Sequence, residues 1–203
     1  TAMTSGYHVI LNDQRQETLE RAQMGIESRL KHMVEKGTMS EEEFQDCMGR
    51  LKIDTRLSAA READLVVEAI FENLEAKQAV FRQLEEICPD HTIFASNTSS
   101  ISLTALAAAT KRPSRVVGMH FFSPVPKMKL CEVIFGLLTA QDVLEDIKEV
   151  GEKMGKTLIL ADDKPGFIVN RALLPMLNEA VQVLDEDIGS VEDVDEGMIR
   201  GCN

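Results

Sequence analysis

Short β-prone runs alternate with amphipathic helical segments along most of this chain, and this alternation constrains the fold more than any other feature. A strand is expected at 7–11, and a helix with one apolar face is expected at 14–36. Further strands are expected at 51–55, 65–70, 92–95, 115–119, 130–135 and 157–160. Strands that alternate with helices predict parallel β-α-β units, and so a doubly wound α/β domain.

The pattern is interrupted at Pro165-Gly166, and only helices are expected beyond it: one long apolar helix and one short final helix. We therefore expect an α/β domain over residues 1–164 and the beginning of an all-α domain over residues 165–203. The second part holds too little material for a core of its own, so we expect the sequence to be cut short at this end.

Composition excludes several classes of partner. Lys and Arg number 22 against 34 Asp and Glu, which gives a formal net charge of −12. Such a surface repels phosphate backbones and anionic lipid, so we expect no nucleic acid and no membrane partner. No apolar run approaches the roughly 20 residues that cross a bilayer. The four cysteines and four histidines are scattered, which predicts reduced thiols and no metal site.

Asp13 ends the first expected strand, just before a long helix. In a dinucleotide-binding Rossmann fold an acidic residue in this place holds the adenosine ribose, whereas the alternative is an ordinary turn aspartate. The motif G-x-G-x-x-G should lie about 20 residues earlier, yet only twelve residues precede Asp13, and Gly6 is the sole glycine among them. We therefore expect a Rossmann-like sheet without its first strand and glycine loop, in a sequence truncated at both ends.

The missing strand has a structural consequence. In the strand order 3-2-1-4-5-6 the first strand lies in the middle of the sheet. Its absence would leave the two halves of the sheet without a shared hydrogen-bonding partner.

His120 follows the expected strand 115–119, at the edge where open α/β sheets bind ligands. Glu132 lies inside the apolar strand 130–135, where a carboxylate is costly unless it is paired. A contact between the two would fix the imidazole tautomer and stabilise the imidazolium formed on proton abstraction. The alternative is a structural histidine and a glutamate that faces water.

Two further polar runs lie near expected strand or domain ends. The run S-N-T-S-S at 96–100 follows the strand 92–95, and the alternative is a plain helix cap. The run D-K-P-G-F-I-V-N-R at 163–171 joins the two expected domains and opens the long helix. Asn170 falls in the first turn of that helix, where a solvated asparagine is the alternative.

Taken together, these runs resemble the 3-hydroxyacyl-CoA and 3-hydroxybutyryl-CoA dehydrogenases. The matching motifs are N-T-S-S at 97–100, G-M-H-F-F-S-P-V-P at 118–126, K-L-C-E-V-I at 129–134, P-G-F-I-V-N-R at 165–171 and V-E-A-I-F-E-N-L at 67–74. The likeness runs from about residue 6 to residue 203, in order and with compatible spacing.

The resemblance implies an oxidoreductase that interconverts (S)-3-hydroxyacyl-CoA and 3-oxoacyl-CoA by hydride transfer to or from NAD, in fatty-acid β-oxidation or butyrate-type metabolism. It implies His120 as catalytic base and Glu132 as its partner. Ser99 and Asn170 would bind the substrate. The implied cofactor-binding residues are Asp13, Glu72, Lys77 and Asn97.

Partners and setting follow from the same resemblance: an acyl-CoA thioester substrate, a homodimer through the helical domain, and a bacterial cytoplasm or a mitochondrial matrix. Asp13 favours NAD over NADP because its carboxylate repels a 2′-phosphate, although Arg15 close by could accept that phosphate. Two rivals remain, a dehydrogenase of free hydroxy acids and a family member that is not an enzyme. The former generally uses a lysine as acid-base group, so His120 and Glu132 favour the thioester family.

Overall fold

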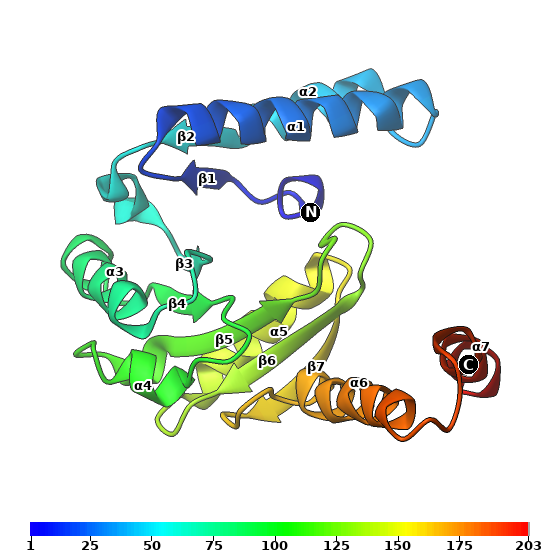
Figure 1. Ribbon diagram of the computed structural model, residues 1–203. Coiled ribbons are helices and arrows are strands. Elements are labelled where there is room, and N and C mark those ends of the chain that lie inside the picture. Colours follow the sequence, from blue (N-terminus) through cyan, green and yellow to red (C-terminus); the bar gives the residue numbers. More distant parts are fainter. Residues whose placement is uncertain (203) are drawn as a thin grey trace.

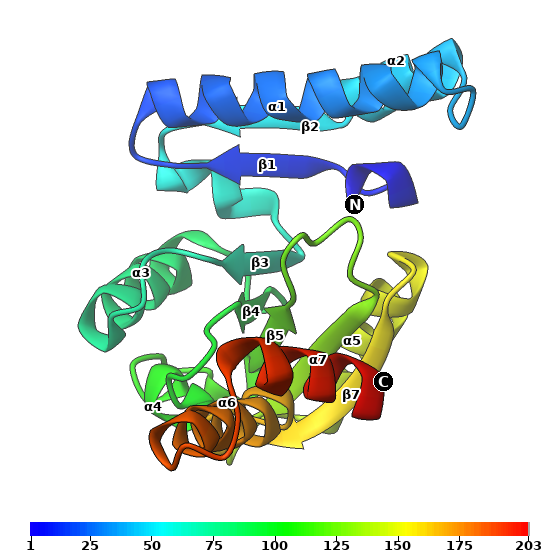
Figure 2. The same ribbon diagram turned by 45° about the vertical axis from the view of Figure 1, so that its right-hand side comes forward.

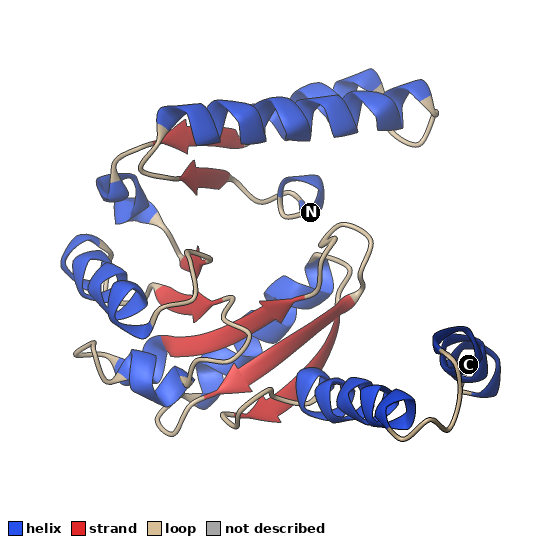
Figure 3. Ribbon diagram, viewed as in Figure 1, coloured by secondary structure: helices blue, strands red, loops and turns tan. Residues whose placement is uncertain are grey.

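The computed structural model describes residues 1–202, and every strand and helix expected from the sequence is present with bounds shifted by a few residues (Figure 1, Figure 3). The strands are β1 (Val9–Asn12), β2 (Leu51–Asp54), β3 (Leu65–Glu68), β4 (Ile93–Ser96), β5 (Val116–Phe121), β6 (Leu130–Phe135) and β7 (Thr157–Asp162). The α-helices are α1 (Gln16–Glu35), α2 (Glu41–Gly49), α3 (Leu74–Ile87), α4 (Leu103–Ala107), α5 (Gln141–Lys153), α6 (Val169–Asp185) and α7 (Val191–Gly201).

The strands form two separate sheets. β1 pairs with β2 in parallel, and a five-stranded sheet has the order β3-β4-β5-β6-β7. β1 and β3 point in the same direction, although they belong to different sheets (Figure 2). The Rossmann-like α/β fold class is therefore confirmed, and so is the expectation that the two halves of the sheet share no hydrogen-bonding partner.

One pairing differs from the all-parallel sheet that the alternation predicts, because β5 and β6 run antiparallel. A parallel connection needs a crossover of about a dozen residues or more, usually through a helix. The hairpin loop 122–129 is shorter than that and contains no helix. The chain therefore turns back on itself after β5. β6 then pairs with β7 in parallel.

Helices cover both faces of the five-stranded sheet. α3 and α4 pack on one face, where Phe81 and Leu103 are fully buried. α5 packs on the other face through Val143 and Ile147. α1 and α2 cover the small sheet with a separate apolar cluster that includes Leu30. Each sheet thus has its own core.

α6 leads away from the large sheet, and α7 follows it (Figure 1). Neither helix buries a residue, and several of their apolar side chains are exposed: Leu174, Leu177, Val181, Val191 and Ile199. An apolar face of this kind is typical of a helix that packs against further protein. Within residues 1–202, no helix has the length and apolar character that a membrane span requires.

Asp163 follows β7 and fixes the start of α4. Its carboxylate accepts hydrogen bonds from the backbone N–H groups of Leu103 (2.9 Å) and Thr104 (2.8 Å) and from the hydroxyl of Ser102 (2.7 Å). Burial alone would raise the pKa of Asp163, but these donors outweigh it and hold the pKa below its ordinary value. The charged form of Asp163 therefore stabilises the fold.

We expect Asp163→Asn to lower the free energy of unfolding by about 1 kcal/mol at neutral pH, because a charged cap becomes a neutral one. The folded-state pKa is lowered, so the stabilisation is present above the unfolded pKa and is lost as pH falls through the folded pKa. Urea unfolding at several pH values should therefore show the difference between wild type and variant shrinking below about pH 4.

The exposed neighbour Asp162 provides the control. Asp162→Asn should change the free energy of unfolding by less than about 0.5 kcal/mol at every pH. An effect of Asp163→Asn that keeps its full size in acid would contradict the role of the charge.

Candidate active site

His120 and Glu132 are direct neighbours across the antiparallel pair of β5 and β6. Cross-strand neighbours project from the same face of a sheet, so their side chains meet. Nδ1 of His120 lies 2.7 Å from Oε2 of Glu132. Both side chains are buried, Glu132 completely. The hairpin thus brings together two residues that the sequence places on separate strands.

The second oxygen of Glu132 reaches the start of α6. Oε1 accepts hydrogen bonds from the backbone N–H groups of Ile168 (3.1 Å) and Val169 (2.9 Å). The first N–H groups of a helix have no partner within it, and the positive end of the helix dipole favours a carboxylate. These donors, together with the ring of His120, offset the cost of burying the charge of Glu132.

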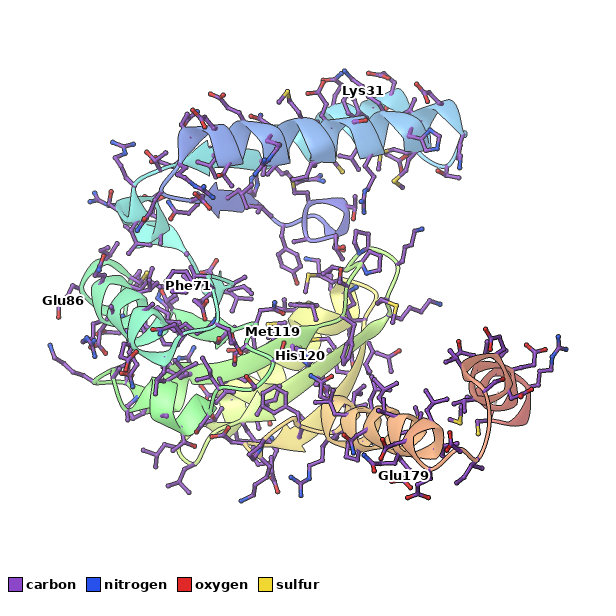
Figure 4. The ribbon with its side chains drawn as sticks, viewed as in Figure 1. Lys31, Phe71, Glu86, Met119, His120 and Glu179 are labelled. Carbon is purple, nitrogen blue, oxygen red and sulfur yellow. The ribbon has the colours of Figure 1, made fainter. Side chains whose placement is uncertain are left out.

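The same bond defines the tautomer of His120. An ionised carboxylate only accepts hydrogen bonds, so Nδ1 is the donor and Nε2 of the neutral ring keeps its lone pair. None of the hydrogen bonds within residues 1–202 involves Nε2. The rings of Phe122 and Phe167 flank the imidazole at centroid distances of 4.7 and 5.6 Å. Nε2 of His120 is therefore a basic nitrogen on a ring that two aromatic side chains flank. Figure 4 shows where His120 lies on the large sheet.

Residues 97–100, here called the polar loop, follow β4 at the edge where β5 also ends. The side-chain oxygen of Asn97 accepts a hydrogen bond from the backbone N–H of Phe121, the residue after His120 (2.9 Å). Ser99 is exposed. Asn170 lies in the first turn of α6, beside the amides that bind Glu132, and is half-buried. Asn97 and Ser99 thus lie at this edge, whereas Asn170 lies at the start of the helix whose amides bind Glu132.

Glu72, in the segment between β3 and α3, holds the polar loop through its carboxylate. Oε1 accepts hydrogen bonds from the hydroxyl of Thr98 and from the backbone N–H of Ser99 (3.1 Å). Burial alone would raise the pKa of Glu72, but the bond from Thr98 and the charge of Lys77 outweigh it and lower the pKa. Glu72 is therefore a carboxylate, and its side chain is 40% exposed.

Lys77 differs from the other candidates because its side chain is only 1% exposed. Its ammonium lies between Oε1 of Glu68 (2.8 Å) and Oε2 of Glu72 (3.3 Å). The side chain thus faces carboxylates inside the protein, and a ligand meets Glu72 before it meets Lys77.

Asp13 stands apart from the other candidates. It follows β1, and its Oδ1 accepts a hydrogen bond from the backbone N–H of Arg15 at 2.8 Å. No hydrogen bond or ion pair among the described residues joins Asp13 to the rest of the site. The carboxylate is 37% exposed, and it is the kind of acceptor that ribose hydroxyls bind. Asp13 and Glu72 are thus two carboxylates that are accessible to solvent.

Sequence reasoning missed two buried charges beside the site. Glu68 is the last residue of β3 and pairs with Lys77. Lys156 donates hydrogen bonds to the carbonyls of Val125 and Met128, both in the hairpin loop. The available signal for Glu68 was a carboxylate at the end of an otherwise apolar strand, the same signal that singled out Glu132. Lys156 gave no comparable signal, because a lysine before a strand is ordinary.

Within residues 1–202, no group of three or more His, Cys, Asp or Glu side chains is arranged to hold a metal ion. The site consists instead of a Rossmann-like sheet, a carboxylate-paired histidine and accessible carboxylates after two parallel strands. This combination is that of a dinucleotide-dependent dehydrogenase.

Comparison with known proteins gives the particular family. Residues 1–164 match the NAD binding domain of 3-hydroxyacyl-CoA dehydrogenase, and residues 166–203 match the C-terminal domain of 3-hydroxyacyl-CoA dehydrogenase. The chain belongs to the 3-hydroxyacyl-CoA dehydrogenase family, so the resemblance seen in the sequence motifs is confirmed.

Named relatives agree with this placement. A probable 3-hydroxybutyryl-CoA dehydrogenase of Bacillus subtilis is 45% identical over 203 residues, which are 100% of this chain and 71% of the relative. The mitochondrial hydroxyacyl-coenzyme A dehydrogenase of Sus scrofa is 41% identical, over 99% of this chain and 66% of the relative. The crystal structure of (S)-3-hydroxybutyryl-CoA dehydrogenase from Ralstonia eutropha is 38% identical with a TM-score of 0.96, over 99% of this chain and 71% of that one.

The bonds around Glu132 predict a large effect on stability. Glu132→Gln keeps the shape of the side chain but removes the charge and one of its two acceptor oxygens. We expect it to lower the free energy of unfolding by about 2–3 kcal/mol, measured by urea unfolding. Glu149→Gln, on the exposed face of α5, is the control and should change it by less than about 0.5 kcal/mol. Equally small effects of both changes would contradict the bonding of Glu132.

Proposed function

We propose that this protein interconverts (S)-3-hydroxyacyl-CoA and 3-oxoacyl-CoA by hydride transfer to or from NAD, with His120 as the catalytic base. The observation that carries the proposal is the buried contact between His120 and Glu132, which leaves Nε2 free of protein partners within residues 1–202. The names of the relatives, 3-hydroxybutyryl-CoA and hydroxyacyl-coenzyme A dehydrogenase, support the acyl-CoA substrate class.

In the direction of oxidation, Nε2 of His120 accepts a hydrogen bond from the 3-hydroxyl of the substrate and then takes its proton. Glu132 stabilises the imidazolium that forms, and the amides of α6 keep Glu132 in place. Ser99 and Asn170 hydrogen-bond the substrate beside His120. General-base assistance of this kind is typically worth roughly 10²–10⁴ in rate. In the direction of reduction, the imidazolium returns the proton to the oxygen of the 3-oxo group.

The cofactor is assigned to residues at the carboxyl ends of the strands. NAD, when bound, supplies the hydride acceptor. Asp13 holds the adenosine ribose, while Glu72 and Asn97 line the nicotinamide half and Lys77 acts behind Glu72. The carboxylate of Asp13 supports NAD over NADP because it repels a 2′-phosphate. Arg15, whose Nε lies 3.9 Å from Asp13, reduces that preference.

The proposal also covers the domains, the oligomeric state, the metabolic role and the cellular location. Residues 1–164 form the NAD-binding domain, and residues 165–203 begin a helical domain through which two copies form a homodimer. The exposed apolar faces of α6 and α7 support the dimer. The setting is fatty-acid β-oxidation or butyrate-type metabolism, in a bacterial cytoplasm or a mitochondrial matrix. The relative from Sus scrofa is named as mitochondrial, which supports the second location for a eukaryotic protein.

His120→Gln in the full-length protein tests the assignment of the base. We expect kcat to fall by roughly 10²–10⁴, because glutamine retains polarity but cannot take a proton. The measurement is the loss of NADH absorbance with acetoacetyl-CoA as substrate. A variant that keeps more than about a tenth of the wild-type kcat contradicts the role of His120.

Free 2-oxo and 3-oxo acids serve as control substrates for the same assay, and circular dichroism shows whether the variant is folded. Turnover by the wild type on acetoacetyl-CoA, with little turnover on the free acids, supports the thioester assignment. The reverse preference contradicts it. A folded full-length protein without turnover on either class contradicts the proposed reaction.

A further inference from the structure

Glu68 is a buried carboxylate that the proposed reaction does not use. It ends β3, and its cross-strand neighbour in β4 is Ser96. Ser96 is in turn the neighbour of Gly118 in β5, two residues before His120. The side chain of Glu68 is 1% exposed, so it needs internal partners to remain charged.

Glu68 has these partners at both oxygens. Oε1 lies 2.8 Å from Nζ of Lys77 and accepts a hydrogen bond from the backbone N–H of Ile70 at 2.6 Å. Oε2 accepts a hydrogen bond from the hydroxyl of Ser96 at 2.6 Å. The hydroxyl oxygen of Ser96 accepts a hydrogen bond from the backbone N–H of Thr98 at 3.2 Å, within the polar loop. Glu68 therefore joins the end of β3 to the segment that follows β4.

Lys77 supplies the ammonium that binds Glu68. Its three donors have three acceptors: Oε1 of Glu68 (2.8 Å), the carbonyl of Ile70 (3.2 Å) and Oε2 of Glu72 (3.3 Å). Each donor thus has an acceptor inside the protein, and Lys77 links the carboxylate of Glu68 to that of Glu72.

Glu72 connects the ammonium of Lys77 to the polar loop. It lies between the buried ammonium and the polar loop, and its Oε1 accepts hydrogen bonds from Ser100 as well as from Thr98 and Ser99. Two carboxylates thus share one ammonium, and one of them, Glu72, also orders the polar loop. The position of Glu72 depends on how strongly Glu68 engages Lys77.

We propose that Glu68 is a positioning residue: it holds the ammonium of Lys77, and through it the carboxylate of Glu72 and the polar loop, in the arrangement that binds the dinucleotide cofactor. This inference rests on the proposed function for the identity of the cofactor. Without the charge of Glu68, Glu72 is the sole carboxylate near the ammonium and moves toward it, away from the polar loop. Cofactor binding then weakens, while the contact between His120 and Glu132 is unchanged.

The test compares four variants of the full-length protein: Glu68→Gln, Lys77→Met, the double variant, and Glu85→Gln. Glu85 is the matched control, since it is a mostly buried carboxylate on the same helix as Lys77 and lies 3.9 Å from Arg112, remote from the polar loop. NADH binding is measured by fluorescence titration without substrate. The KM for NADH, kcat and the melting temperature are measured alongside.

Glu68→Gln should weaken NADH binding roughly tenfold, the lower end of what loss of an orienting partner costs at metal sites. The KM for NADH should rise by more than kcat falls. In the Lys77→Met background, Glu68→Gln should have no further effect on NADH affinity, because Glu68 acts through Lys77. Glu85→Gln should lower the melting temperature and leave NADH affinity unchanged.

Wild-type NADH affinity in a folded Glu68→Gln variant overturns the inference. It is also overturned if the loss of NADH affinity in the double variant equals the product of the losses in the two single variants. If Glu68→Gln does not fold, the double variant tests the inference instead. It lacks both buried charges, so neither is left without its partner. It should bind NADH as weakly as Lys77→Met, and wild-type affinity overturns the inference. A wild type that binds NADH without turnover contradicts only the proposed reaction, whereas one that binds no NADH overturns the cofactor assignment and this inference together.

Discussion

The carboxylate of Glu132 is the point where three parts of the chain meet. β6 carries it, β5 supplies His120 to one oxygen, and α6 starts with two amides on the other. A fully buried charge is stable there only because all of these donors are in place. Loss of any one of the three parts would leave a buried charge short of partners. The same contact that orients the histidine therefore also fixes where the helical segment begins, so that fold and site depend on one interaction.

Glu68 repeats this arrangement on β3, three strands away from β6. Each carboxylate is buried, lies on an otherwise apolar strand and binds one nitrogen-containing side chain together with backbone N–H groups. The difference lies in the partner. An imidazole can accept and release a proton in a reaction, whereas a lysine ammonium that binds carboxylates suits positioning. Asn97 connects the two regions, because it lies in the polar loop and binds the backbone of β5 next to His120. This bond fixes the polar loop relative to His120.

Local features of the sequence predicted most of the fold. The alternation of strands and helices depends on neighbours along the chain, so it can be read without tertiary information. The separation into two sheets was predicted from the lack of a glycine motif ahead of Asp13, and the strand pairing confirms it. The antiparallel turn after β5 was missed, although the short hairpin loop contains a signal for it. The partners of Glu68 and Lys77 could not be predicted, because nothing in their spacing fixes which buried charges meet.

The central claim is that Glu132 holds the proton on Nδ1 of His120 and leaves Nε2 as the base. Nitrogen-15 NMR of the histidine side chains reports this tautomer directly, in the full-length protein at a pH where the ring is neutral. The account predicts a protonated Nδ1 and an unprotonated Nε2 for His120, and loss of that preference in Glu132→Gln. A ring protonated at Nε2 in the wild type would contradict the account, because the nitrogen that must accept the substrate proton would already carry one.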